Sequence, residues 1–320
     1  MTRFTPAAIV LLALVNTAFA QSYPNRPITL TVSTTPGASP DLIARLFGQA
    51  LSGALKTPVV IENKGGANGQ IAVAAVAQAA PDGYSFLATT GATLTTNPAL
   101  YPKTGQLVVS AFTPVTRFAH QDFIITARPS LNVRSLAELK EWTKKNPGKL
   151  NVATTALGSL AYLTAQLFKQ AASLDFVTIP HNGGGLAVGA VLGDHADLLV
   201  ETVSLSRPHI ESGKLIPIAT TGPRRSAFLP DVPTLKELGL EGCETSGWTA
   251  MVAPKDTPSA IIALIQGELA KSAKSDEVKK KLADLSAEPV VNTPEEFARE
   301  LREERAMWGR VIKQAGIKLE

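Results

Sequence analysis

The sequence predicts an α/β protein whose two lobes meet at a hinge. Short apolar segments with strand character alternate with longer segments whose apolar residues recur at helical spacing, which is typical of layered α/β folds. Two segments of similar chemistry, residues 34–41 and 154–159, each follow a predicted strand and precede a predicted helix. Two extended segments, residues 112–117 and 248–253, are placed to carry the chain between the halves. We therefore expect two similar lobes that close on one small acid.

The first of these turns follows a strand predicted at residues 28–33, where apolar and hydroxyl side chains alternate. The helix after it is predicted from apolar residues that share one face: Ile43, Leu46, Phe47, Ala50 and Ala54. A strand, a turn of small residues and a helix direct backbone N–H groups and the positive end of the helix dipole at an anion. The turn residues expected to contact a ligand are Thr34, Thr35, Pro36, Gly37, Ala38 and Asp41. An alternative role for Asp41 is structural, because a carboxylate in the first helical turn can bind the N–H groups of the loop.

The first half continues with a strand at residues 58–61, a glycine-rich loop at 62–69, a helix at 70–80 and a strand at 84–88. The loop matches neither a dinucleotide-binding fingerprint nor a phosphate-binding loop, so we interpret it as a tight turn. The last strand runs into Thr89 and Thr90. Because ligands of open parallel sheets lie beyond the carboxyl ends of the strands, these threonines are expected to line the same pocket as the first turn.

The second half repeats this arrangement. Extended segments are expected at residues 112–117 and 123–126, followed by a helix at 135–145 whose Ser135 and Glu138 match a capping box. The second turn lies between a short strand at 150–153 and a helix at 160–171, and its expected ligand contacts are Thr154, Thr155, Gly158 and Ser159. The later elements are strands at 176–180, 197–200 and 215–219 and helices at 186–192 and 205–212. The first two of these strands end in His181 and Glu201, which are further candidates for the pocket.

The last part of the chain returns to the first lobe. The extended segment at 248–253 precedes helices at 258–273 and 276–285 and a final helix from Thr293, where Thr293 and Glu296 match a capping box. Trp248, at the crossing, either walls the pocket or packs in the hinge. We place the first lobe at residues 21–118 plus 248–320 and the second at 119–247.

The first twenty residues are predicted to be a cleaved signal peptide. Arg3 gives a short positive start, residues 9–15 are apolar, and Ala18-Phe19-Ala20 fits the small-residue cleavage pattern. The apolar run is too short to favour a membrane span, and Gln21 stands where a lipoprotein would carry cysteine. We expect an exported, soluble, periplasmic protein that is cleaved after Ala20.

Charge and composition narrow the function classes. The formal net charge of +4 falls to +3 without Arg3, the only charged residue among the first twenty, and the mild excess suits anionic ligands. The basic residues are scattered without interleaved aromatic residues, so nucleic acid is not an expected partner. The single Cys243 excludes an internal disulfide, and the four histidines lack metal-ligand spacing. No metal or other cofactor is expected.

Seven motifs occur in order along the chain: residues 23–28 (YPNRPI), the Pro36-Gly37 turn with Asp41, residues 58–67 (PVVIENKGGA), 79–84 (AAPDGY), 183–185 (GGG), 229–234 (LPDVPT) and 253–258 (APKDTP). Together they resemble the Bug family of extracytoplasmic solute receptors of tripartite tricarboxylate transporters. The resemblance covers essentially all of the mature chain. It implies a type II periplasmic binding protein, whose two lobes close like a flytrap on an organic acid and whose first turns hold the carboxylate through backbone amides and ordered waters.

The sequence departs from the family pattern at positions expected to line the pocket. Ala38 replaces the second glycine of the first turn, and Tyr162 stands where a histidine often follows the second turn. His181-Asn182 replaces the usual Tyr-Lys, and Glu201-Thr202 replaces an Asp-Asn pair. These changes indicate a ligand that can differ from those of better-known members, and the loss of the lysine argues against a second strong carboxylate site at that wall.

We expect a receptor without enzymatic activity that delivers a small organic carboxylate to the membrane permease subunits of a tripartite tricarboxylate transporter, acting as a monomer. An alternative partner is a membrane histidine kinase, since both partners would read the same closure. A remote alternative is a serine hydrolase built on Ser159 and His181, although the G-x-S-x-G elbow is lacking. Whether the acid is aliphatic or aromatic, and whether it has one carboxylate or two, stays open at this stage.

Overall fold

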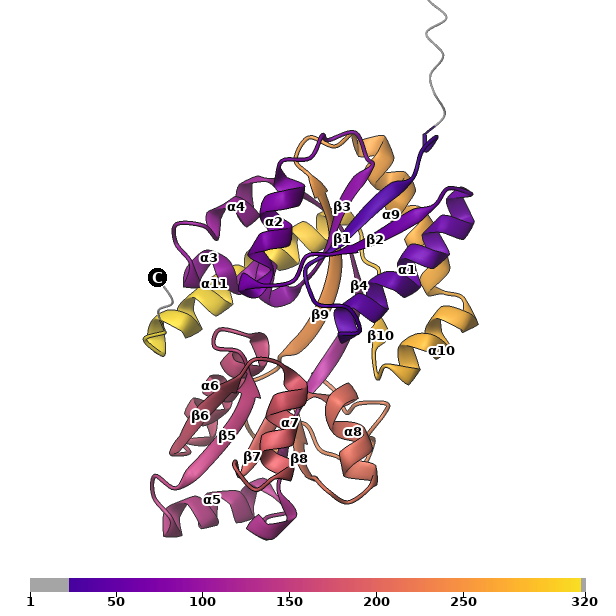
Figure 1. Cartoon of the computed structure of the whole chain (residues 1–320). Coiled ribbons are helices and arrows are strands. Elements are labelled where there is room, and N and C mark those ends of the chain that lie inside the picture. The colour runs from indigo at the N-terminus through magenta and orange to yellow at the C-terminus, as the bar shows by residue number, and fades with distance from the viewer. Residues whose placement is uncertain (1–22, 318–320) are drawn as a thin grey trace, which may run out of the picture.

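The computed structural model describes residues 23–317 and shows an α/β protein of two lobes (Figure 1). The elements of the first part of the chain are β1 (Ile28–Val32), α1 (Ser39–Leu55), β2 (Val59–Asn63), η3 (Ala67–Gly69), α2 (Gln70–Ala77), β3 (Ser85–Thr90), η4 (Ala92–Thr96), α3 (Asn97–Leu100), α4 (Gln106–Ser110) and β4 (Phe112–Ala127). The middle part contains η5 (Pro129–Leu131), α5 (Leu136–Lys145), β5 (Leu150–Thr155), α6 (Leu160–Ala172), β6 (Phe176–His181), α7 (Gly184–Leu192), β7 (Leu198–Thr202), α8 (Val203–Glu211) and β8 (Ile216–Thr220). The last part contains β9 (Ser246–Pro254), α9 (Ser259–Ala273), α10 (Asp276–Asp284), β10 (Glu288–Pro289) and α11 (Pro294–Gln314). The expected signal peptide, residues 1–20, lies outside the described residues.

The strands follow the order β2-β1-β3-β9-β4-β7-β5-β6, with β8 and β10 also paired to β4. In one lobe β1 pairs in parallel with β2 and β3, and in the other β5 pairs in parallel with β6 and β7. Each lobe therefore has the parallel strands that place strand ends and helix starts at one edge. The N-terminal and C-terminal elements share one lobe, whereas the middle elements form the other (Figure 1).

Strand β4 belongs to both lobes. Its first part pairs antiparallel with β9, from Phe112 opposite Pro254 to Asp122 opposite Ser246. Its last part, from Phe123 onward, pairs with β7 and β8. The predicted boundaries at residues 118/119 and 247/248 thus fall inside β4 and β9, two strands that run between the lobes (Figure 1).

Each lobe has its own hydrophobic core. In the first lobe, α1, α9 and α10 cover the sheet, and Phe47 of α1 stacks on Phe118 of β4 with ring centroids 4.8 Å apart. In the second lobe, the rings of Phe168 and Phe176 lie 6.3 Å apart within a core built from α5, α6 and the neighbouring strands. Apolar periodicity predicted the buried face of α1 in part: Ile43, Leu46 and Phe47 are buried, but Ala54, near the end of the helix, is exposed. Cys243 is buried in the second core, where burial raises the pKa of its thiol to about 11.

The crossing is fixed to α11 by a charged cluster around Arg117. The Arg117 guanidinium lies 4.3 Å from the centre of the Trp248 ring, its Nε is 3.1 Å from a carboxylate oxygen of Glu300, and it also contacts Glu304. The Trp248 indole N–H donates to Glu304 at 3.0 Å. Because these groups come from β4, β9 and α11, the last helix is bound to both crossing strands.

Two parts of the structure differ from the sequence prediction. The extended segments expected at 112–117 and 123–126 are one strand, because residues 118–122 continue the pairing with β9. Residues 92–110, for which no element was predicted, form η4, α3 and α4. Threonine hydroxyls donate to carbonyls four residues earlier in this region, Thr95 to Gly91 at 2.7 Å and Thr96 to Ala92 at 2.9 Å. This region was not predicted because its sequence has no apolar periodicity of the kind that indicates a helix.

The predicted capping boxes differ in outcome. At Thr293 both reciprocal hydrogen bonds with Glu296 form, so this box is confirmed. At Ser135 the side chain accepts from the Glu138 N–H, but the Glu138 carboxylate binds the N–H of Arg134 instead. That carboxylate therefore satisfies a donor one residue before the cap. No helix in the described range 23–317 combines the length and the apolar character needed to cross a membrane.

The box at Thr293 generates a stability prediction. Thr293→Ala removes the acceptor for the Glu296 N–H at the start of α11, so the free energy of unfolding should fall by about 1 kcal/mol in denaturant titrations. Thr293→Ser keeps a hydroxyl at the cap and should stay close to wild type. Equal losses in both variants would show that the hydroxyl does not stabilise this helix.

Candidate functional site

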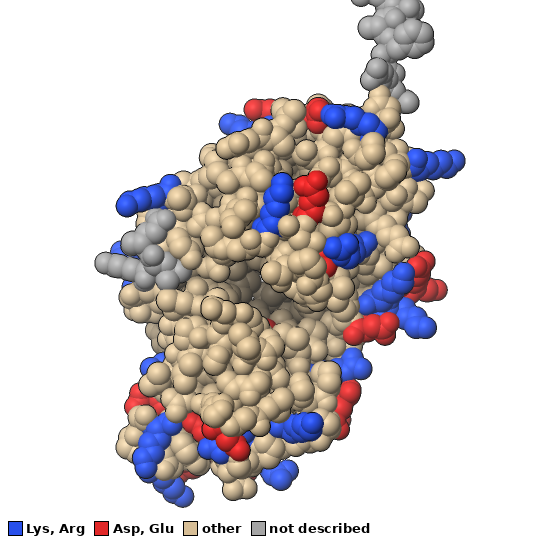
Figure 2. Space-filling view, in the orientation of Figure 1, with Lys and Arg blue, Asp and Glu red and all other residues tan. Residues whose placement is uncertain are grey.

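A cavity of about 630 Å³ lies between the two lobes. Figure 2 shows the hollow bordered by uncharged residues, with lysine, arginine and acidic side chains placed further out on this face. The first lobe contributes the turn before α1, the η3 segment and the end of β3, and the second contributes the turn before α6 and the starts of α7 and α8. Among the described residues that line it, no side chain is a lysine, arginine or histidine, and the one acidic side chain is that of Glu201.

The first turn presents the start of α1 to this cavity. Gly37 adopts a positive φ of 81°, which a side chain disfavours, and Ala38 forms the N-cap without any side-chain capping hydrogen bond. The Thr34 Oγ1 atom is buried and has no hydrogen-bond partner. An uncapped helix start and an unsatisfied hydroxyl are both suited to a ligand that accepts hydrogen bonds.

Asp41 holds this turn from behind. Its carboxylate accepts hydrogen bonds from the Gly37 N–H at 2.8 Å, Arg45 Nε at 3.0 Å and Asn63 Nδ2 at 2.7 Å. Burial alone would raise the pKa of Asp41, but these hydrogen bonds outweigh it and hold the pKa below its ordinary value. These contacts agree with the structural role for Asp41, in which its carboxylate binds the N–H groups of the loop. The side chain is only 1 % exposed and lies outside the cavity lining.

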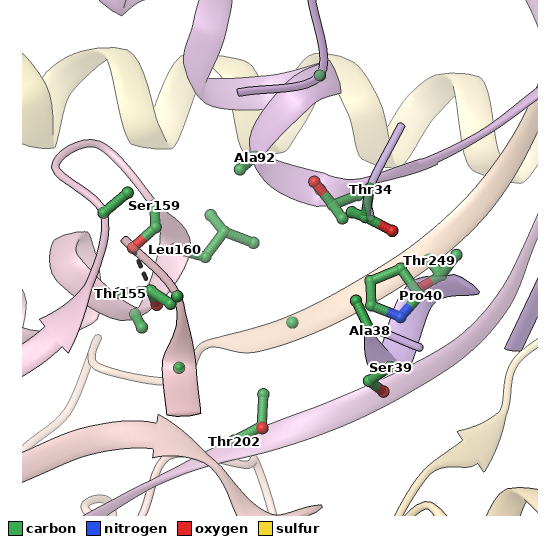
Figure 3. Close-up of a pocket in the computed structure, with 18 of the residues that line it drawn as sticks. Thr34, Ala38, Ser39, Pro40, Ala92, Thr155, Ser159, Leu160, Thr202 and Thr249 are labelled. Carbon is green, nitrogen blue, oxygen red and sulfur yellow. Dashed lines mark hydrogen bonds between the residues drawn. The ribbon is translucent and has the colours of Figure 1, made fainter. Parts of the chain in front are cut away.

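The second turn differs from the first because its helix is capped. Ser159 forms the N-cap of α6, and its Oγ accepts the Tyr162 N–H at 3.1 Å. The Ser159 hydroxyl also lies 3.4 Å from Thr155 Oγ1, the contact dashed in Figure 3. The same view shows Ser159 and Thr155 across the cavity from Thr34 and Ala38 of the first turn. Two helix starts from opposite lobes therefore face one space.

Glu201 ends β7 at the wall of the second lobe. The side chain is 4 % exposed; one carboxyl oxygen accepts the Thr202 N–H at 2.8 Å and the other lies 3.1 Å from Thr155 Oγ1. Burial raises the pKa of Glu201, and the hydrogen bonds from Thr202 and Thr155 offset this only in part. A Cβ on Gly184 would lie 2.9 Å from Glu201 Oε2, so glycine at the start of α7 makes room for the carboxyl group.

The predicted site residues divide into two groups. Those that line the cavity are Thr34, Thr35, Gly37, Ala38, Thr90, Thr155, Ser159 and Glu201. Those outside the lining are Pro36, Asp41, Thr89, Thr154, Gly158, Tyr162 and His181. Successive side chains of a strand point to opposite faces, so Thr89 and Thr154 turn away where Thr90 and Thr155 turn in.

The residues outside the lining have other contacts. Thr89 Oγ1 is 2.7 Å from Ser33 Oγ in the interior, and the Thr154 hydroxyl donates to the Thr155 carbonyl at 2.9 Å. Tyr162 contributes its N–H to the cap, while its ring packs beside the cluster that contains Trp308. The Nε2 atom of His181 is buried without a hydrogen-bond partner.

Sequence reasoning missed several lining residues: Asn68, Thr93, Gln121, Phe123, Leu160, Gly183–Gly185, Leu205 and Thr249. Gln121 accepts from the Ser39 hydroxyl at 2.8 Å and donates to the Leu285 carbonyl at 2.8 Å, joining the first turn to β4. No sequence pattern around Gln121 predicts that it lines the cavity, whereas the glycine triplet at 183–185 could be recognised as a motif. Trp248 lines the cavity and also packs at the crossing, so both of its alternatives describe it.

The hydrolase alternative lacks the required geometry. Within residues 23–317, Ser159 binds the Tyr162 N–H and Thr155, and no hydrogen bond joins it to His181. A serine nucleophile needs a base within hydrogen-bond reach. The arrangement of hydroxyls and helix starts is suited to holding an acceptor ligand.

The comparisons with known proteins agree with this geometry. A family model described as "Tripartite tricarboxylate transporter family receptor" matches residues 43–317. Protein BugT of Bordetella pertussis is 34 % identical over 301 residues, covering 94 % of this chain and 92 % of BugT. The structure of R. palustris Rpa4515 with adipate is 32 % identical with a TM-score of 0.84, covering 93 % of this chain and all of that one. The structure of MatC from Rhodopseudomonas palustris with bound malate is 29 % identical with a TM-score of 0.78, covering 91 % of this chain and all of MatC.

The contacts of Asp41 generate a pH prediction. Its folded-state pKa is depressed below the ordinary 3.8, so its stabilisation is fully present above that value and is lost as the pH falls through the folded pKa. Asp41→Asn should therefore lower the free energy of unfolding by about 1–3 kcal/mol near neutral pH, and the difference from wild type should shrink in acid. Denaturant titrations at several pH values measure it. The exposed Asp231→Asn is the control, and a pH-independent loss would contradict the assignment.

Proposed function

Because the chain belongs to the tripartite tricarboxylate transporter receptor family, we propose that it is a periplasmic receptor for a small organic carboxylate. The lobes close on the acid, and the loaded receptor delivers it to the permease subunits of a membrane transporter. We further propose that the protein acts as a monomer and does no chemistry on its ligand. The family match over residues 43–317 and the solved structures of similar proteins support this assignment.

The observation that carries the proposal is that two helix starts from opposite lobes face one cavity. Backbone N–H groups and the positive dipole ends of α1 and α6 favour an anion there without any cationic side chain in the lining. Three residues with hydroxyl side chains, Thr34, Thr90 and Ser159, line the same space. A charge-assisted hydrogen bond contributes about 1.5–3 kcal/mol, so a few of them are enough for micromolar affinity, about −8 kcal/mol.

The wall of the cavity indicates the body of the ligand. Phe123, Leu160, Leu205 and Trp248 line it together with small residues, and no lysine or arginine among the described lining residues offers a second charged subsite. Rpa4515 with adipate and MatC with malate show that similar proteins take aliphatic dicarboxylates. We propose an acid held by one carboxylate, with the rest of the molecule against this apolar wall.

We retain as proposals the export of the chain with cleavage after Ala20 and the division into lobes at residues 21–118 plus 248–320 and 119–247. Export is supported by a structural neighbour described as the periplasmic binding protein BugD, which is 32 % identical with a TM-score of 0.80. The division is supported by the change of strand partners along β4, from β9 to β7 and β8. The crossings through β4 and β9 would then be the hinge.

The proposal predicts a ligand-dependent gain in stability. A carboxylate at 100 times its dissociation constant should stabilise the folded protein by about 2.7 kcal/mol, which a thermal-shift screen of mono-, di- and tricarboxylates, amino acids, sugars and aromatic acids detects. A shift with carboxylates supports the receptor. A shift only with sugars, amines or metals would contradict it.

A second variant tests the turn before α6. Ser159→Ala should weaken binding of the acid found in the screen about tenfold in calorimetry, because one hydrogen bond to a charged oxygen is lost. Ser275→Ala is the matched control, since Ser275 also caps a helix through its Oγ but lies outside the cavity lining. Both variants should lose about 1 kcal/mol of stability, whereas only Ser159→Ala should lose affinity. Unchanged affinity would remove Ser159 from the site.

A further inference from the structure

A serine of the first turn has the hydrogen of its hydroxyl group committed to the interior of the protein. Ser39 begins α1 and lines the cavity beside Ala38 and Pro40 (Figure 3). Its hydroxyl donates to Gln121 Oε1 at 2.8 Å, and Gln121 Nε2 donates to the Leu285 carbonyl at 2.8 Å. The Ser39 oxygen therefore has lone pairs to offer a ligand but no hydrogen.

The Leu285 carbonyl fixes the direction of both hydrogen bonds. A backbone carbonyl oxygen can only accept, so the amide nitrogen of Gln121 faces Leu285 and the amide oxygen faces Ser39. An amide turned the other way would set two oxygens against each other at Leu285. Because an amide oxygen also only accepts, Ser39 has to be the donor to Gln121. The Gln121 side chain is buried, which holds this arrangement in place.

The end of β3 repeats this pattern with other residues. Thr93 Oγ1 donates to the Asn68 carbonyl at 3.1 Å and lies 3.2 Å from Thr90 Oγ1. Because the hydrogen of Thr93 goes to a carbonyl, Thr90 is the donor in the contact between the two hydroxyls. Thr90 and Ser39 both line the cavity, so the side of the first lobe presents hydroxyl oxygens that accept hydrogen bonds.

Resting on the proposed function, we propose that the carboxylate ligand carries a hydroxyl group and that this hydroxyl donates a hydrogen bond to Ser39. The ligand class is then the hydroxy acids. Ser39 is a specificity-determining residue because its oxygen contacts the ligand hydroxyl. Gln121 is a positioning residue that acts on the ligand through Ser39. The N–H groups at the two helix starts remain available for the carboxylate.

A hydroxyl group suits this part of the cavity better than an ammonium group does. Both groups donate hydrogen bonds, but an ammonium ion taken out of water needs an anionic partner. The described lining residues include one acid, Glu201 of the second lobe, and its two carboxyl oxygens already accept from the Thr202 N–H and the Thr155 hydroxyl. The side of the first lobe offers neutral acceptors, which favour a neutral donor.

Ser159, on the other side of the cavity, is bound less firmly than Ser39. Its contact with Thr155 Oγ1 is 3.4 Å long, whereas the hydroxyl of Ser39 is 2.8 Å from its acceptor. A charged ligand oxygen is a stronger acceptor than a hydroxyl, so it can take the Ser159 hydrogen from Thr155. The two sides thus differ: Ser159 can give a hydrogen to a carboxylate, and Ser39 can accept one from a hydroxyl.

The ligand hydroxyl is tested by calorimetry with matched sets of acids. Each set keeps one carbon skeleton and carries a hydroxyl, a hydrogen pair or a carbonyl at the same carbon: lactate, propionate and pyruvate; malate, succinate and oxaloacetate; mandelate, phenylacetate and phenylglyoxylate. A further set is built on the strongest acid of the thermal-shift screen. In the set whose skeleton fits, the hydroxy acid should bind about tenfold more tightly than either partner, because one hydrogen bond is gained.

Two variants separate the roles of the two residues. Ser39→Ala removes the acceptor, so the hydroxy acid should lose its advantage over the acid without the hydroxyl. Gln121→Leu releases the hydrogen of Ser39, so the keto acid, whose carbonyl accepts, should gain affinity relative to the hydroxy acid. Ser272→Ala is the matched control, because the Ser272 hydroxyl also donates to an internal carbonyl, that of Glu268 at 2.8 Å, but lies outside the cavity lining.

The control should keep the wild-type preference, and circular dichroism checks that each variant is folded. If Gln121→Leu does not fold, Ser39→Ala decides the proposal.

The outcomes distinguish this inference from the proposed function. Acids that bind without any preference for the hydroxy acid, or a preference that survives Ser39→Ala, would overturn the inference and leave the receptor proposal intact. Tighter binding of alanine than of lactate, lost in Ser39→Ala, would also overturn it, because the donor would then be an ammonium group. If no acid of these sets or of the screen binds, the proposed function itself fails.

Discussion

The continuous pairing of β4 with β9 is the constraint on which the rest of the structure depends. These strands run antiparallel from Phe112 opposite Pro254 to Asp122 opposite Ser246, and beyond that point β4 exchanges β9 for β7 and β8. The two lobes are therefore the two ends of shared strands, and a bend in these strands changes the separation of the turns before α1 and α6. Arg117 holds this crossing to α11 through Glu300 and Glu304.

Under the proposed function, the cavity would hold an anion by the placement of N–H groups and hydroxyls and not by a cationic side chain. An arginine or lysine in the wall would attract many anions. N–H groups and hydroxyls held in place by the fold bind a ligand oxygen atom well only at the point where they converge. Asp41 shows how the turn is kept in place, since its carboxylate is committed to Gly37, Arg45 and Asn63. The Asp41 carboxylate orders the turn, and Arg45 balances its negative charge outside the cavity lining.

Much of the fold could be predicted from the sequence because its strands and helices are regular. Apolar periodicity located α1 and α6, and the strand–turn–helix order placed both turns at the cavity. The family motifs added the overall topology, which periodicity alone does not contain.

The site was predicted only in part: Thr90 and Thr155 line the cavity, but neighbouring Thr89 and Thr154 do not, because the phase of a strand decides which side chain turns inward. Gln121 and Thr249 belong to the crossing strands β4 and β9. Their places in the cavity lining depend on pairing between residues that are distant in sequence, which no local pattern predicts.

The arrangement of one lobe from both ends of the chain also constrains the order of folding. β3 pairs with β9, and α1 packs against α9 and α10, so the first lobe cannot complete its core until the last quarter of the polypeptide is present. The segment between, from β5 to β8, has local partners and its own core. During synthesis from the N-terminus, the second lobe would therefore fold before β1, β2 and β3 have all their neighbours. Bringing β9 and the last helices back to these strands would then be the slow step, because these contacts are distant in sequence.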